Sequence, residues 1–334
     1  MSAPQSPKGN ILVADDNEAN RELLSALLSP EGYQVVCAED GQQALARVNS
    51  GSVDLALLDV VMPRPTGFEI CQEMKSKPET RLIPIILLTS LNSDADRLHG
   101  IMCGADDFLN KPVNKHELLA RVHSLLRLKQ FTDELDNAET VLFSLALSIE
   151  AKDPYTEGHC DRLSKYSVAL GEKLALTQEL RVALRRGGLV HDIGKLSVPE
   201  HILLKPGPLT PEERKIMEQH TVIGEKICAP LRSFRHVLPI IRHHHEKQDG
   251  SGYPDGLKGE QIPLTARILQ VTDIYDALTT DRPYRKALPL DKAFSIMRDE
   301  AKRGWWDGSL IDQLELLVRE SAPQLADVGA KNER

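Results

Sequence analysis

The first third of the chain alternates short apolar runs with amphipathic stretches. The apolar runs are ILVAD (Ile11–Asp15), DLALLD (Asp54–Asp59) and PIILLT (Pro84–Thr89). Short, nearly continuous apolar runs are typical of buried parallel strands. The amphipathic stretches between them lie at 18–28, 41–48 and 67–75. This alternation predicts an α/β doubly wound sheet, in which ligands bind at the carboxyl ends of the strands.

Beyond Lys111 the pattern changes to long helical periodicity. The stretch from His116 to about Glu150 contains no Pro or Gly and predicts one long helix or two abutting helices. Its apolar stripe either pairs with a second copy of the chain as a coiled coil or packs on the chain's own domains. The segments from Asp153 onward also look helical. We therefore expect an α/β domain over 8–126, a helical connector over 127–150 and an all-α domain over 151–326.

Composition narrows the class of protein. A chain of 334 residues with 41% hydrophobic content suits two globular domains. We expect no membrane span, because no apolar run approaches about 18–20 residues. The odd count of five cysteines predicts reduced thiols and a cytoplasmic location, and the net charge of -8 argues against DNA binding.

Acidic and hydroxyl side chains end the predicted strands of the first domain. The charge of Asp15, Asp16 and Asp59 favours a hard cation such as Mg²⁺. Asp15 and Asp16 would hold this ion, and Asp59 would be the nucleophile for a phosphoryl group. Lys111 would neutralise phosphate charge, and Thr89 would donate a hydrogen bond to the added group. Taken singly, acids at strand ends also often cap the following helix.

The segments around these residues resemble the receiver domain of two-component response regulators over about the first 125 residues. The matching segments are ADD at 14–16, DVVMP at 59–63, LTS at 88–90 and DFLNKP at 107–112. The resemblance implies a flavodoxin-like fold and phosphorylation of Asp59 by a cognate sensor histidine kinase. It also implies that Thr89 and Phe108 form the switch pair. Because a receiver is a switch, its output is expected downstream.

Five histidines and two aspartates stand out in the second half. Imidazole and carboxylate bind first-row divalent ions where no thiolate is used. Seven such groups are too many for one ion, and they would fill most of two coordination shells if one carboxylate bridges. This pattern suggests metal-assisted hydrolysis of a phosphate ester. The seven residues are His159, His191, Asp192, His220, His244, His245 and Asp273.

The segments that carry these seven residues resemble the HD-GYP family of cyclic di-GMP phosphodiesterases from about Asp153 to Asp312. They include GGLVHDIGKL at 187–196, EQHTVIGEKI at 218–227, HHHEKQDGSGYPDG at 243–256 and VTDIYDALTTDRPYRKA at 271–287. The resemblance implies that all seven bind two metals and that Asp192 bridges them. It implies hydrolysis of cyclic di-GMP to linear pGpG, with GMP as a further product left open.

The resemblance also extends to substrate contacts. The HD segment reads as one helix, so Lys195 shares a helix face with His191 and Asp192. Lys195 is expected to act with Asp192 in catalysis by stabilising phosphate charge. Arg282 and Arg285 match positions that contact the substrate phosphates, a task that suits a guanidinium.

Two departures from the family pattern change the expectations. Tyr155 stands where some members carry a glutamate associated with a third metal, so we expect two metals. Iron or manganese is expected first, with nickel and cobalt as alternatives. The GWWDG segment at 304–308 replaces the family's usual Phe-Asp-Pro ending. The glycine-rich loop at 249–256 is interpreted first as structural and second as a contact for a protein partner.

The sequence leaves alternative residue roles and alternative functions open. His243 is not expected to be a ligand, and Asp276 and Asp281 are expected to be helix caps or solvated acids. A different class of function is a module that senses cyclic di-GMP, or docks a protein, with little or no turnover. A third is the same chemistry on another cyclic nucleotide. The sequence determines neither the sign of regulation by Asp59 nor the cognate kinase.

Overall fold

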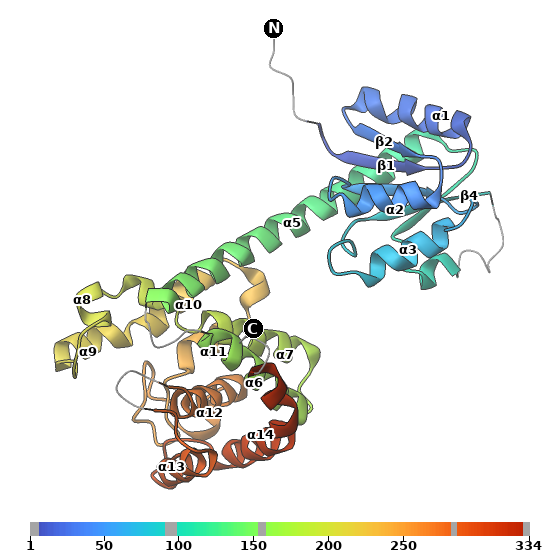
Figure 1. Cartoon of the computed structure of the whole chain (residues 1–334). Helices are drawn as coiled ribbons and strands as arrows, with labels where there is room; N and C mark the ends of the chain where they lie inside the picture. Colours follow the sequence, from blue (N-terminus) through green and yellow to red (C-terminus); the bar gives the residue numbers. More distant parts are fainter. Residues whose placement is uncertain (1–6, 91–98, 153–157, 282–285, 330–334) are drawn as a thin grey trace. The chain divides into compact units, whose positions relative to one another are not determined.

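The computed structural model describes residues 7–90, 99–152, 158–281 and 286–329. The chain divides into two compact units, Met1–Ala138 and Glu139–Arg334. A single helix, α5 (Lys115–Lys152), begins in the first unit and ends in the second (Figure 1). Of the two possibilities left open for this stretch, one continuous helix is therefore the one that forms.

The first unit contains a five-stranded parallel sheet with strand order β2-β1-β3-β4-β5. This is the flavodoxin-like order, and it confirms the predicted doubly wound class. The three predicted strands appear within one residue of their expected bounds. The strands are β1 (Asn10–Ala14), β2 (Gln34–Ala38), β3 (Leu55–Asp59), β4 (Ile85–Thr89) and β5 (Asp107–Asn110).

Helices cover both faces of this sheet because alternate strand residues point to opposite sides. Ile11 and Val13 pack with α1 (Glu18–Leu28) and with the start of α5. Leu12 and Ala14 belong to the core under α2 (Gly41–Asn49) and α3 (Gly67–Ser76). Helices α1, α2 and α3 each begin at a side-chain cap, which Asn17, Asp40 and Thr66 provide in that order.

The second unit is helical, as predicted, and α12 packs against α6, α7, α11, α13 and α14. Phe234, Ile240 and Phe294 are fully buried in its core. None of the described helices is long and apolar enough to cross a membrane. The helices are α6 (His159–Lys173), α7 (Gln178–Val190), α8 (Glu200–Leu203), α9 (Pro211–Glu218), α10 (His220–Cys228), α11 (Leu238–His243), α12 (Leu264–Thr279), α13 (Leu290–Lys302) and α14 (Gly308–Gly329).

The helix predicted through the HD segment is interrupted, so the prediction of one continuous helix is wrong. α7 ends at Val190, and a short 3-10 helix, η2 (Ile193–Ser197), follows Asp192. The physical reason is close packing of η2 against α10. A Cβ at Gly194 would lie only 1.8 Å from the His220 carbonyl oxygen. The break brings the HD pair and the start of α10 together.

Candidate metal centre and phosphorylation site

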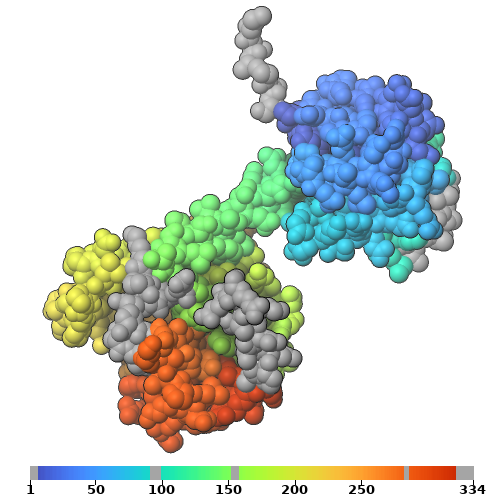
Figure 2. Space-filling model, viewed as in Figure 1, coloured from blue at the N-terminus to red at the C-terminus, as the bar shows by residue number. Residues whose placement is uncertain are grey.

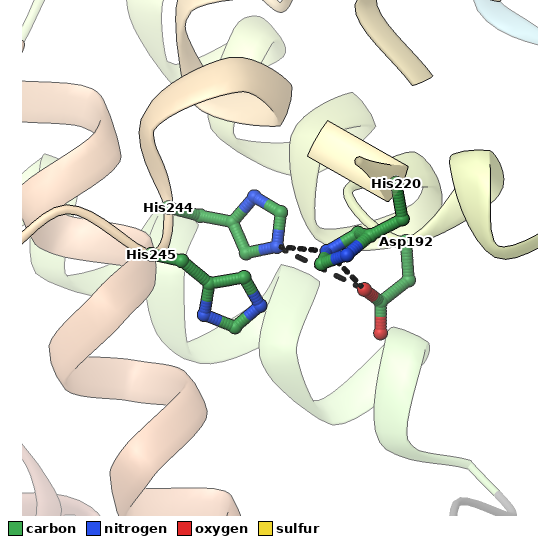
Figure 3. A group of neighbouring side chains, drawn as sticks. All are labelled: Asp192, His220, His244 and His245. Atoms are coloured by element: carbon green, nitrogen blue, oxygen red, sulfur yellow. Dashed lines mark hydrogen bonds and ion pairs between the residues drawn. The ribbon is translucent and has the colours of Figure 1, made fainter. Parts of the chain in front are cut away.

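Four of the seven predicted ligands meet at one point of the helical unit. Asp192 follows α7, His220 opens α10, and the pair His244 and His245 follows α11. Their ligand atoms all lie within 4.8 Å of one another. Figure 3 shows the rings of His220 and His244 turned toward the Asp192 carboxylate. Asp192 Oδ1 lies 3.3 Å from His220 Nε2 and 3.8 Å from His244 Nε2.

Three of the buried imidazoles are oriented by their own backbone. In each, Nδ1 lies within hydrogen-bond distance of the carbonyl oxygen three residues earlier. A carbonyl oxygen only accepts, so each Nδ1 carries a proton, and Nε2 is the ring atom left to bind a metal ion. The pairs are His191 with Gly188 (3.2 Å), His220 with Met217 (2.7 Å) and His244 with Ile241 (2.8 Å).

The donor set at this point fits a divalent cation. Asp192 Oδ1 is buried, and no described residue donates a hydrogen bond to it. The Nε2 atoms of His220 and His244 are 3.4 Å apart. Burial lowers the pKa of His220 to about 4, so its ring is neutral at pH 7. A cation among these atoms would satisfy all three donors.

Asp192 itself is held in the ionised form. Burial opposes its charge, but the Lys195 ammonium and His191 outweigh burial and keep the pKa of Asp192 well below its usual value. Lys195 Nζ donates to Asp192 Oδ2 at 2.6 Å, so the two side chains meet although the helix between them is broken. An ionised carboxylate beside neutral imidazoles is the donor chemistry that a transition-metal ion requires.

The remaining predicted ligands lie on the other side of Asp192. His191 Nε2 is 3.3 Å from Asp192 Oδ2, and the rings of His159 and His191 are 5.6 Å apart between centroids. His159 Nε2 lies 3.5 Å from Asp273 Oδ1. Asp192 therefore faces one ligand group through Oδ1 and another through Oδ2. This arrangement suits a carboxylate shared by two ions.

The expectation that Asp276 is a helix cap or a solvated acid is wrong. Asp276 is only 2% exposed, and its Oδ2 lies 2.7 Å from His159 Nδ1. The sequence carried a signal for this contact, because Asp276 follows Asp273 by three residues and shares its helix face. Asp281, in contrast, is exposed and accepts a hydrogen bond from Ala287 N at 2.6 Å.

The glycine-rich loop at 249–256, which contains Gly252, Tyr253 and Pro254, supports the centre from the side of His245. A Cβ at Gly252 would lie 2.3 Å from a backbone nitrogen, so only glycine fits there. The ring of Tyr253 lies 4.8 Å from the ring of His245, and Tyr253 N donates to His245 O at 3.2 Å. Glu246 is fully buried and accepts hydrogen bonds from Asp255 N and Leu257 N. These two supporting roles, of Tyr253 and Glu246, were not predicted.

Other residues singled out in the sequence do not belong to this cluster or fall outside the described residues. His243 Nδ1 lies 3.5 Å from Asp255 Oδ2, and His243 does not belong to the cluster around Asp192. Arg282 and Arg285, the predicted substrate contacts, fall outside the described residues, as does Tyr155. The GWWDG segment packs beside the start of the glycine-rich loop, where the Lys247 ammonium lies 3.7 Å from the centre of the Trp305 ring.

The predicted phosphorylation site assembles at the carboxyl edge of the sheet. Carboxylate oxygens of Asp15, Asp16 and Asp59 lie within 4.8 Å of one another. Lys111 Nζ bridges Asp15 Oδ2 at 2.7 Å and Asp59 Oδ2 at 2.8 Å. Burial raises the pKa of Asp59, and Lys111 offsets this only in part. Three acids around one ammonium leave an excess of negative charge, which fits a hard divalent cation.

The two predicted switch residues lie on neighbouring strands. Thr89 is buried at the end of β4, next to the carboxyl edge that holds Asp59. Phe108 lies on β5, where it pairs with Leu87 of β4. A Cβ at Gly100 would come within 2.2 Å of the Phe108 ring, so the ring occupies space that a glycine leaves open.

Comparison with known proteins identifies the families of the two domains. Residues 11–123 match the response regulator receiver domain family, and residues 144–310 match the HD domain family. The chain belongs to the response regulators that carry an HD domain as their output. The HD domain makes this protein a metal-dependent phosphohydrolase.

Curated relatives span most of this chain. A "Probable cyclic di-GMP phosphodiesterase" of Vibrio cholerae serotype O1 is 35% identical, covering 93% of this chain and 78% of the relative. The "Cyclic di-GMP phosphodiesterase response regulator RpfG" of Xanthomonas campestris pv. campestris is 36% identical, covering 91% of this chain and 86% of the relative. A "3'3'-cGAMP-specific phosphodiesterase 3" of Vibrio cholerae is 42% identical over 49% of this chain and 36% of its own length.

Proposed function

We propose that this response regulator hydrolyses cyclic di-GMP to linear pGpG and that phosphorylation of Asp59 controls the rate. The observation that carries the proposal is the Asp192 carboxylate, which faces imidazoles through both of its oxygens. The names of two relatives that span most of the chain support the choice of substrate. A second hydrolytic step on pGpG would give GMP.

The reaction needs water to form a bond to phosphorus while the P–O3′ ester bond breaks. When bound, two divalent ions supply activated water and neutralise the charge of the attacking and leaving oxygens. Asp192, His220, His244 and His245 would hold one ion. His159, His191 and Asp273 would hold the other, with Asp192 shared between them. Iron or manganese suits these nitrogen and oxygen donors, as do nickel and cobalt, and Mg²⁺ suits the acids of the receiver.

Positive side chains would position the phosphates. Lys195 lies beside Asp192 and presents a compact charge at the centre, where negative charge develops on phosphorus oxygens. We assign Arg282 and Arg285 to the substrate phosphates because a guanidinium binds two oxygens at once. The glycine-rich loop at 249–256, which exposes Asp249 and Ser251, is the surface we assign to a protein partner.

One observation favours a second substrate. The relative with 42% identity over the second half of this chain is named for 3'3'-cGAMP. That dinucleotide shares the phosphodiester ring of cyclic di-GMP and differs in one base. Because both dinucleotides present the same phosphodiester group, we propose that the metal centre can act on either.

Product analysis tests this proposal. Full-length protein purified without oxygen and loaded with Fe²⁺ or Mn²⁺ is expected to convert cyclic di-GMP to pGpG, and the same protein after treatment with a chelator is not. Chromatography of the products, run in parallel with 3'3'-cGAMP, gives the preference between the two substrates. If cyclic di-GMP stays intact in the presence of metal-loaded protein, the hypothesis that the protein hydrolyses it is rejected. Tight nucleotide binding without product would then favour a sensing or scaffolding role.

The connector helix is the element that can carry the phosphorylation signal. Its last turn lines a small cavity, where Glu150 adjoins His159, Asp192 and Lys195. Its middle carries exposed apolar side chains at alternating spacings of three and four residues: Leu128 (62% exposed), Phe131 (50%) and Leu135 (49%). Figure 2 shows the atoms of α5, in green, on the viewed face. We propose that a second copy of the chain pairs with this seam.

A helix break in α5 should uncouple the two units. Asn137→Pro removes a backbone donor at an exposed position and costs the helix about 3 kcal/mol. We expect the ratio of turnover with and without a phosphoryl mimic at Asp59 to fall to about one in this variant, while basal turnover persists. Asn137→Ala is the control, because alanine keeps the helix and should keep the ratio. Light scattering on both variants measures whether the chain is a dimer. If the ratio of turnover with and without the phosphoryl mimic is unchanged in Asn137→Pro, α5 does not carry the signal.

The remaining partners follow from the receiver. A sensor histidine kinase is the proposed phosphoryl donor for Asp59. The five cysteines are free thiols, which suits the reducing cytoplasm we propose as the location.

A further inference from the structure

Where helices α6 and α12 pack together, two basic side chains of α6 meet two acidic side chains of α12. His159 and Arg162 lie three residues apart on α6, and Asp273 and Asp276 lie three residues apart on α12. Each pair therefore presents two groups on one helix face. The two helices pack directly on each other, so these four side chains meet at a single crossing.

The contacts at this crossing form a chain that leads from Arg162 through Asp276 and His159 to Asp273. Asp276 Oδ1 accepts from Arg162 Nε at 2.6 Å, and Asp276 Oδ2 accepts from Arg162 Nη2 at 3.0 Å. The same Oδ2 lies 2.7 Å from His159 Nδ1, while His159 Nε2 points to Asp273 Oδ1 at 3.5 Å. The guanidinium fixes the carboxylate, and the carboxylate fixes the imidazole.

This orientation differs from that of the other buried histidines of the centre. His191, His220 and His244 are each held through Nδ1 by a neutral backbone carbonyl of their own segment. His159 is held by a carboxylate from another helix. Arg162 holds the side chain of Asp276 with two hydrogen bonds, the fork by which a guanidinium pairs with a carboxylate. A carboxylate partner at Nδ1 makes Nε2 a stronger metal ligand than a carbonyl partner does.

We propose that Asp276, fixed by Arg162, is a positioning residue for the ion bound by His159 and Asp273, and that the two halves of the metal centre are therefore unequal. The ion beside His159 depends on a side chain from α12, whereas the ion among Asp192, His220 and His244 depends on local backbone. This inference rests on the proposed two-metal centre. It adds two residues to that centre that were not predicted from the sequence.

The test is a Mn²⁺ titration of metal-stripped full-length protein, followed by calorimetry and by electron paramagnetic resonance. The parent protein is expected to bind two ions and to give the spectrum of a coupled pair. Asp276→Asn removes the charge but keeps an acceptor for the ring. We expect one ion to bind as before and the other to weaken by about 10–100-fold, as measured for outer partners of metal ligands elsewhere. At one ion per chain the spectrum should be that of isolated Mn²⁺.

Two further variants separate positioning from simple stability. Asp161→Asn changes an exposed acid on the same helix, whose partner is Lys165, and should leave both ions unchanged. Arg162→Lys keeps a cation opposite Asp276 but loses the fork, so it should weaken the same ion by a smaller factor. It also serves as the second test if Asp276→Asn fails to fold, as judged by its melting curve.

Some outcomes overturn the inference. Two ions bound with parent affinities in Asp276→Asn would show that the carboxylate only ties α6 to α12, as would equal weakening of both ions. Fewer than two ions in the parent protein would remove its basis. Two ions in the parent protein without hydrolysis of a cyclic dinucleotide would instead defeat the proposed function and leave the inference standing.

Discussion

Replacing Asp192 by asparagine is expected to abolish hydrolysis. The amide has the shape of the carboxylate but lacks the charge, and only one of its two terminal atoms can donate a lone pair to a metal. Because Asp192 faces His220 and His244 through Oδ1 and His191 through Oδ2, the loss falls on both ligand groups. Loss of an outer partner costs about 10–100-fold in metal affinity or activity, so loss of a shared inner ligand should exceed that range.

The measurement combines turnover of cyclic di-GMP with bound metal per chain. Asp192→Asn should lack product at enzyme concentrations where the parent protein completes the reaction, and it should hold less than one ion. Phosphoryl uptake by Asp59 provides the folding control for the rest of the chain. A matched pair of histidines sharpens the assignment: His244→Ala should lose metal, whereas His243→Ala, whose ring faces Asp255, should not. Parent-like turnover in Asp192→Asn would remove this residue from the centre.

Replacing Asp59 by asparagine is expected to eliminate phosphorylation of the receiver. Asp59 is the buried acid at the end of β3, and its carboxylate shares the Lys111 ammonium with Asp15. An amide is a poor nucleophile and removes one of the three acids that fit Mg²⁺. Incubation with a small-molecule phosphoryl donor and Mg²⁺, followed by phosphate-affinity electrophoresis, should show no shifted species in Asp59→Asn.

The control is the acid just before the same strand. Asp54 precedes β3 and accepts a hydrogen bond from Asn10 N at 2.8 Å, away from the carboxyl edge. Asp54→Asn should take up phosphate as the parent protein does. Residual uptake in Asp59→Asn would place the acceptor on another acid. Basal hydrolysis in Asp59→Asn should equal that of the unphosphorylated parent protein, because the metal centre lies in the other unit.

In the receiver, the strands that could be predicted from the sequence are those whose two faces are both buried. β1, β3 and β4 read as continuous apolar runs, because a central parallel strand has no solvent face. β2 was not predicted, since this edge strand is only partly buried and its sequence, QVVCA, is short. The α5 stretch was ambiguous between one helix and two, because periodicity measures the repeat and not the continuity of the backbone.

The sequence by itself determined the two families to which the domains belong. It also predicted the donor atoms, with seven imidazoles and carboxylates for metals and three acids and a lysine for a phosphoryl group. Residue types fix donor atoms, so ligands can be proposed without coordinates. Only the tertiary structure decided how those donors are supported. The break after Val190, the burial of Asp276 and its link to Arg162 each depend on contacts between distant segments. Such contacts leave no periodic trace in the chain, because they arise where separate helices cross.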